Sequence, residues 1–88
     1  MAVQQTQPYN VQLAVQPDDS ADLARFTSDQ HLTGAIYVGV GGDVVVVTQN
    51  NQSQLYKNVP SGTLLTVAAR RVNATNTTAL NMLALYVV

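Results

Sequence analysis

Four consecutive valines, Val44 to Val47, lie in the stretch AIYVGVGGDVVVVT (residues 35–48), whose only charged residue is Asp43. β-Branched residues favour strands, and a strand that is apolar at every position needs cover on both of its faces. In a chain of 88 residues, which is one domain at most, only one face of such a strand is expected to look into the core. We therefore expect the N-terminal segment or a neighbouring subunit to cover the other face, since a bare valine strand would promote aggregation.

The residues around the valines predict a β-hairpin. The runs 35–40 (AIYVGV) and 43–49 (DVVVVTQ) are rich in the β-branched and aromatic residues that strands favour. Gly41 and Gly42 separate them, and glycine readily supplies the positive φ of a tight turn. We expect the two runs to pair antiparallel.

The remainder of the chain also reads as short strands between turns. Three more strands are predicted, at 54–59 (QLYKNV), 63–72 (TLLTVAARRV) and 79–88 (ALNMLALYVV). The turn at 60–62 (PSG) and the loop at 73–78 (NATNTT) separate them. Strands of this length and spacing, with no helical crossover, predict an all-β fold, a small antiparallel β-sandwich or barrel.

Side-chain alternation gives expectations within these strands. In the strand 54–59, Tyr56 is expected on one face, opposite Leu55, Lys57 and Val59. In the strand 63–72, Arg70 and Arg71 are expected on opposite faces, so that one guanidinium lies toward the core or at its rim. A carboxylate from residues 18–29 is a plausible partner, and a solvated pair at a strand end is the alternative.

The N-terminal part differs in composition from the rest of the chain. Residues 1–17 are rich in Gln, and the alternation of Val11, Leu13 and Val15 predicts a strand or an extended arm with one apolar face. Residues 18–33 hold four of the five acidic residues and predict a structured loop with a short helix. Asp19 or Ser20 is expected to cap a helical turn that runs through Leu23. We divide the chain into an arm or strand at 1–17 and a single β domain at 18–88.

Low charge is the outlying feature of the composition. Charged residues make up 10% of the chain, against about 25% in an ordinary soluble domain, and the net charge is −1. A weakly charged surface costs little to desolvate, which favours burial in an assembly over the simpler interpretation of a weakly charged soluble domain. The charge gives no reason to expect binding to nucleic acid or to a membrane surface, and no apolar run is long enough to span a bilayer.

No motif indicates catalysis or a bound cofactor. Ser28, Asp29 and His31 include the residue types of a hydrolytic triad, but neighbours in one loop do not converge on a substrate as a triad must. The run DDSAD (18–22) lacks the spaced oxygens of a calcium loop, and GVGGD (39–43) precedes a strand rather than the helix of a phosphate site. The chain has no cysteine. We expect no enzyme activity, no metal, no cofactor and no small-molecule substrate.

Four segments, in order, resemble a known family. They are Asp19-Ser20-Ala21-Asp22-Leu23, the hairpin motif at Tyr37 to Asp43, the Lys-Asn-Val-Pro turn at Tyr56 to Leu64 and the Arg-Val-x-Ala-Thr segment at Arg71 to Ala79. Over residues 18–86 the chain resembles the small head spike base proteins of tailed bacteriophages and of phage-derived gene transfer agents. It departs from that pattern in its Gln-rich start and in the segment SDQHLTG (28–34).

The resemblance implies a non-enzymatic virion protein. Members of the family look like compact β domains that sit on the capsid surface, commonly at vertices, and support a fibre or spike. The implied partners are the major capsid protein, a head fibre or spike protein and further copies of the chain. The protein is expected to be made in the host cytoplasm and to lie on the capsid surface of the virion. A trimeric capsid-stabilising cement protein and a receptor- or glycan-binding module on the virion are the alternatives.

These arguments give a set of expected interface residues. In the N-terminal segment they are Tyr9, Val11, Leu13 and Val15. In the β domain they are Val44, Val46, Arg70, Arg71, Leu83, Leu85 and Tyr86, of which the apolar members are expected to serve both the core and subunit contacts.

Overall fold

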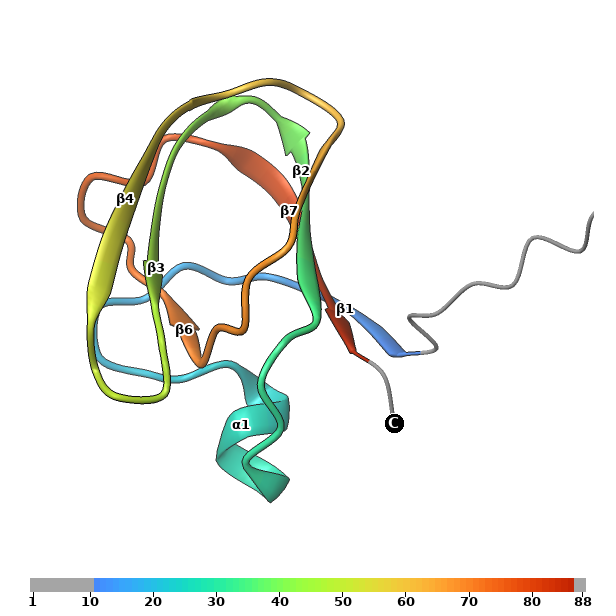
Figure 1. The fold of residues 1–88 in the computed structure, drawn as a ribbon, viewed down its shortest axis with the longest axis vertical. Helices are drawn as coiled ribbons and strands as arrows, with labels where there is room; N and C mark the ends of the chain where they lie inside the picture. Colours follow the sequence, from blue (N-terminus) through green and yellow to red (C-terminus); the bar gives the residue numbers. More distant parts are fainter. Residues whose placement is uncertain (1–10, 87–88) are drawn as a thin grey trace, which may run out of the picture.

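The computed structural model describes residues 11–86, which form two antiparallel sheets and one short helix (Figure 1). The elements are β1 (Val11–Ala14), α1 (Ala24–Asp29), β2 (Ala35–Val40), β3 (Gly42–Val47), β4 (Ser53–Val59), β5 (Thr63–Leu65), β6 (Arg71–Val72) and β7 (Leu80–Tyr86). Sheet A has the order β1-β7-β2-β5, and sheet B has the order β4-β3-β6. The all-β antiparallel class predicted from the sequence is confirmed, as two sheets rather than a closed barrel. No helix among these residues is long and apolar enough to cross a membrane.

The hairpin predicted across Gly41 and Gly42 is wrong. β2 pairs with β5 and β7 in sheet A, whereas β3 pairs with β4 and β6 in sheet B. The chain bends over one end of the molecule from one sheet into the other (Figure 1). Neither glycine has a positive φ. They are needed for close approach, because a Cβ on Gly41 would meet the carbonyl oxygen of Val59, and one on Gly42 would lie 2.7 Å from Oγ1 of Thr78.

The predicted turn at 60–62 is present, and Gly62 adopts a φ of 81° there. Just before it, a β-bulge changes the face of β4. Val44 is opposite Tyr56, but Gly42 is opposite Val59, so β4 has one extra residue in this interval. Asn58 has a φ of 56° in the bulge. Val59 is therefore buried in the same core against which Tyr56 packs. The expectation that Tyr56 and Val59 lie on opposite faces of this strand is wrong, because the bulge shifts the alternation by one residue.

The single strand predicted at 63–72 is two strands in different sheets. β5 belongs to sheet A and β6 to sheet B, and the segment between them crosses from one sheet to the other. Buried Thr33 fixes this crossing: its Oγ1 donates to the carbonyl of Val67 at 2.6 Å and accepts from the amide of Ala69 at 2.9 Å. An irregular segment inside a domain needs such partners for its backbone groups.

The valine run is buried by this chain alone. Val44 and Val46 lie in the main core with Ile36 and Val38 of β2, and all four are fully buried. Val45 and Val47, on the other side of β3, are 8% and 2% exposed. A neighbouring subunit is therefore not needed to cover one valine face, because residues 11–86 of the single chain, which include part of the N-terminal segment, already cover both.

The N-terminal segment and the helix complete the fold. β1 pairs with β7 at the edge of sheet A, and residues 1–10 lie outside the described part of the chain. α1 is preceded by Leu23, and no side chain caps its first turn. The predicted cap by Asp19 or Ser20 is thus wrong. Asp18 instead closes a turn by accepting from the amides of Ser20 and Ala21, at 2.8 and 2.9 Å.

Candidate assembly surfaces

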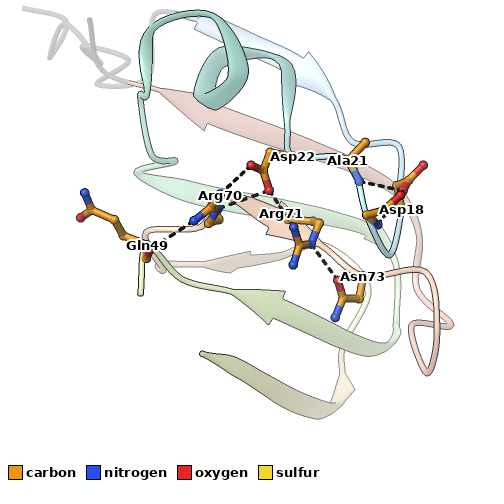
Figure 2. A network of polar contacts seen from close by, with 8 residues as sticks. Asp18, Ala21, Asp22, Gln49, Arg70, Arg71 and Asn73 are labelled. Atoms are coloured by element: carbon orange, nitrogen blue, oxygen red, sulfur yellow. Dashed lines mark hydrogen bonds and ion pairs between the residues drawn. The ribbon is translucent and has the colours of Figure 1, made fainter. Parts of the chain in front are cut away.

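The carboxylate of Asp22 lies between two arginines (Figure 2). Oδ2 accepts from Nη2 of Arg70 at 2.8 Å, and Oδ1 accepts from Nη1 of Arg71 at 2.9 Å. The expectation of a carboxylate partner from residues 18–29 is confirmed. The expected opposite faces are wrong, because Arg70 lies in a bend before β6 and only Arg71 belongs to the strand.

Further contacts hold both guanidinium groups in place. Arg70 Nη1 donates to the carbonyl of Gln49 at 3.3 Å, and its guanidinium lies 4.4 Å from the centre of the Phe26 ring. Arg71 Nε donates to Oδ1 of Asn73 at 3.1 Å. These two side chains are used inside the chain, where they join the loop before α1 to the start of β6. The network is structural, and it leaves little of either arginine for a partner.

The network changes the protonation behaviour of its members. The hydrogen bond from Arg70, together with the charges of Arg70 and Arg71, holds the pKa of Asp22 below its usual value. The same hydrogen bond raises the pKa of Arg70. The pKa of Asp18 is also lowered, first by the amides of Ser20 and Ala21.

Asp19 connects the loop before α1 to the loop after β6. It accepts from the amide and the hydroxyl of Thr75, and these hydrogen bonds lower the pKa of its carboxyl. The acidic run at 18–22 thus serves turns and ion pairs. Within residues 11–86, no group of three His, Cys, Asp or Glu side chains is arranged to hold a metal ion.

The outward face of sheet A is a different kind of surface. None of its four strands contains a charged residue. A row of apolar residues crosses all four strands in register: Ala14 is opposite Leu83, Leu83 is opposite Tyr37, and Tyr37 is opposite Leu64. Directly opposed residues share one face of a sheet, and their neighbours Ile36 and Val38 point into the core. Tyr37 is 38% exposed and Leu64 is 46% exposed. We call these four residues the outward row.

A second exposed apolar pair lies at one end of the same sheet. Val40 is opposite Leu80, and they are 43% and 60% exposed. Single exposed apolar residues are ordinary, but several on one charge-free sheet have the composition of an interface centre. Val40 and Leu80 are each three residues from a member of the outward row on the same strand, so they lie on the opposite face of the sheet, beyond the end of the core. The outward row alone is the candidate assembly surface of the described chain.

The structure places most of the expected interface residues elsewhere. Val44, Val46 and Tyr86 are fully buried, and Val15 and Leu85 are buried almost as deeply. Val11 is half-buried against the core, Leu13 is 38% exposed, Arg70 and Arg71 bind Asp22, and Tyr9 lies outside the described residues. Leu83 is in the outward row. Sequence reasoning missed Tyr37 and Leu64 as members of one surface, because the outward row is visible only once the strands are ordered into sheets.

Comparison with solved structures finds a similar chain in a particle. It comes from the structure described as the capsid of a native GTA (gene transfer agent) particle computed with C5 symmetry. The two chains share 31% sequence identity, and the TM-score is 0.75. The match covers 96% of this chain and 90% of the other. No protein-family model and no curated protein sequence matches this chain.

Proposed function

Since the chain belongs to the family of that gene-transfer-agent capsid chain and is thus a capsid-related structural protein, we propose that it decorates the head of a phage-like particle. In this role it is a homo-oligomeric spike base or decoration protein at the vertices, and it anchors a spike or fibre. The similarity to a capsid chain over nearly the whole domain is the observation that carries the proposal. The resemblance of residues 18–86 to head spike base proteins supports the finer assignment.

The surface of sheet A supports a docking role without chemistry. A charge-free face with Tyr37 at its centre loses little hydration when buried, and tyrosine is enriched in interface centres. We propose that the outward row contacts the shell formed by the major capsid protein. Each contact is small, and repetition by the symmetry of the head makes the attachment strong through avidity.

The test is made on particles. Heads from cells with and without this gene are purified, analysed by mass spectrometry, and imaged by cryo-EM. We expect the protein in the particles, with density at the vertices that disappears when the gene is deleted. A protein absent from the heads overturns the capsid role.

Two other patterns would overturn the finer assignment while keeping the capsid role. Density of trimers spread over the whole shell indicates a cement protein. A protein that is present, leaves spike attachment unchanged on deletion and is needed only for adsorption to cells indicates a receptor- or glycan-binding module.

A further inference from the structure

The outer edge of β4 is an unpaired strand edge among residues 11–86. β4 pairs with β3 alone, and it forms the border of sheet B in Figure 1. The other edge strands, β1, β5 and β6, have four, three and two residues against seven in β4. β4 is therefore the longest edge available for strand addition.

The register shows which backbone groups face outward from β4. Val45, opposite Leu55, accepts a hydrogen bond from the amide of Asn73 on the side away from β4. Val45 and Leu55 are thus a non-hydrogen-bonded pair, and the N–H and C=O of Leu55 point to the open edge. Because strands alternate, those of Ser53 and Lys57 point there too. No hydrogen bond to these groups exists among the described residues.

The core side of β4 is open next to this edge. Gln54 and Tyr56 are opposite the buried residues Val46 and Val44, so their side chains lie on the core side of the strand. Tyr56 packs against the core but is only half-buried, and Gln54 is exposed. Both line a shallow hollow that continues toward the turn before β4. A strand added to this edge would place every second side chain over the hollow.

The chain contains a segment that fits this edge. Residues 1–10 (MAVQQTQPYN) precede β1 and lie outside the described residues. Residues 2–7 include no charged residue, no glycine and no proline, and they are long enough to cover the five residues from Ser53 to Lys57. Val3 is β-branched and is the only large apolar residue among them. Pro8, which has no N–H to give to a ladder, follows directly.

We propose that residues 2–6 of one copy add to β4 of a neighbouring copy as an antiparallel strand. The opposed pairs, with the partner subunit's residue second, are Ala2 and Lys57, Val3 and Tyr56, Gln4 and Leu55, Gln5 and Gln54, and Thr6 and Ser53. The backbone groups of the first, third and fifth pairs exchange hydrogen bonds, so all outward groups of the edge find partners.

The side chains select this register. Val3 covers the half-buried ring of Tyr56 of the partner subunit, and β-branched residues pack well against aromatic ones across strands. A shift of two residues in one direction moves Val3 away from this ring. The opposite shift puts Pro8 opposite Ser53 of the partner subunit, where the ladder needs an N–H. In the proposed register Pro8 falls beyond the end of the ladder, where its missing N–H costs no hydrogen bond.

Reach favours a neighbouring copy over the same chain. The link from Thr6 to Val11, where β1 begins, spans at most about 18 Å. The start of β1 and the strand β4 lie on opposite sides of the molecule (Figure 1). A chain that donates a segment on one side and accepts one on the other makes a head-to-tail contact.

A head-to-tail contact is compatible with the arrangement at a vertex. Repeated around an axis, it closes copies of one chain into a ring. The edge of β4 belongs to sheet B and the outward row to sheet A, so one subunit can use both surfaces at once. The inference names the contact between copies of the homo-oligomer in the proposed function, and it rests on that function in this respect.

Two introduced cysteines report directly on the contact, because the chain has none of its own. Paired residues that exchange both hydrogen bonds have Cα atoms about 5.5 Å apart, which suits a disulfide. Under mild oxidation we expect Gln4→Cys/Leu55→Cys to give a series of disulfide-linked multimers that ends at the closed ring. The rate should be at least about 10-fold higher than for Gln4→Cys/Leu64→Cys. Leu64 is the matched control, since it is 46% exposed against 39% for Leu55 and lies on the other sheet.

A charge tests the side-chain register. Adding Val3→Asp to the Gln4→Cys/Leu55→Cys variant puts a carboxylate over Tyr56 of the partner subunit and should abolish the fast cross-linking. Gln7→Asp adds the same charge beyond the ladder and should leave the rate unchanged. If circular dichroism shows that Leu55→Cys does not fold, Thr6→Cys/Ser53→Cys tests the same register.

The oxidation is carried out on isolated protein and on purified heads. Equal rates for the Leu55 and Leu64 variants in both samples would overturn the proposal. A disulfide within one chain, seen as a monomer on a non-reducing gel, would overturn it too, as would a link from residue 55 to another virion protein. Absence of the protein from heads would instead overturn the proposed function, while the isolated protein still tests the contact.

Discussion

Asp22 and Arg70 are separated by 48 positions in the chain, yet Oδ2 of Asp22 lies 2.8 Å from Nη2 of Arg70. Arg71 binds the other oxygen of the same carboxylate at 2.9 Å. Around them, Asp19 binds Thr75, and the amide of Asp18 binds Val72. The acidic segment between β1 and α1 is therefore held against β6 and the loop that follows it.

The Asp22→Asn variant tests how much this network contributes to the free energy of unfolding. An amide keeps the size of the side chain but loses both ion pairs, and the two arginines are left in a partly buried place. We expect the free energy of unfolding to fall by about 1–2 kcal/mol, a range that allows for solvent screening. Chemical denaturation measures the change. Lys57→Gln, which removes a charge from an exposed side chain, should change it by less than about 0.5 kcal/mol.

Stability should fall in acid. The pKa values of Asp18, Asp19 and Asp22 are lowered in the folded chain from the usual 3.8. As the pH falls below that usual value, these carboxyl groups bind protons in the unfolded chain but remain ionised in the folded chain. The contribution of the lowered pKa values to the free energy of unfolding therefore decreases until the pH has fallen below the folded pKa values. Denaturation curves between about pH 6 and about pH 2 should show a loss concentrated below about pH 4, with a smaller loss in Asp22→Asn. A pH-independent midpoint over this range would contradict the network's role.

Local sequence signals predicted the strands well but not their partners. The ranges of β2, β3 and β4 follow β-branched and aromatic runs, and Gly62 adopts the conformation expected of the turn glycine. Gly41 and Gly42 also look like turn glycines, but their role is to allow close approach of distant segments. Close approach depends on tertiary structure, which a local pattern does not contain.

The candidate surface was only partly predictable for the same reason. Low charge indicated assembly as a hypothesis, but it did not locate a surface, and the longest apolar run is core. The row from Ala14 to Leu64 comes from four strands that are dispersed along the chain. The partner of Arg70 and Arg71 was predictable because a single short segment holds most of the acidic residues.

Gly41→Ala tests the close approach. The added Cβ would meet the backbone at Val59 and lie 2.8 Å from the amide nitrogen of Ser61, so the backbone must move. We expect a loss of about 2–3 kcal/mol in the free energy of unfolding. Gly62→Ala is the matched control, since nothing lies within 4 Å of its Cβ and only the φ of 81° opposes it. Its expected cost is about 1 kcal/mol, and equal costs would contradict this assignment.

The valine run should stabilise the isolated chain. Val46 is fully buried, and Val40 is 43% exposed, so Val46→Ala and Val40→Ala compare one chemical change at two burials. We expect a loss of about 2 kcal/mol for Val46→Ala and less than about 0.5 kcal/mol for Val40→Ala, measured at low protein concentration. If the cost of Val46→Ala appeared only at concentrations where the protein associates, Val46 would be an interface residue after all.

The outward row gives the sharpest separation of folding from assembly. Leu64 is 46% exposed, so Leu64→Glu should change the free energy of unfolding by less than about 0.5 kcal/mol. Leu64 is the member of the outward row on the edge strand β5, and a charge on this charge-free face must be desolvated without a partner when the face docks. Because the loss is repeated at every copy, we expect the amount of protein bound to purified heads to fall at least about 10-fold. Thr27→Glu adds the same charge to an exposed position on α1 and should bind as the wild type does. Wild-type binding by Leu64→Glu would place the contact with the head on another surface of the domain.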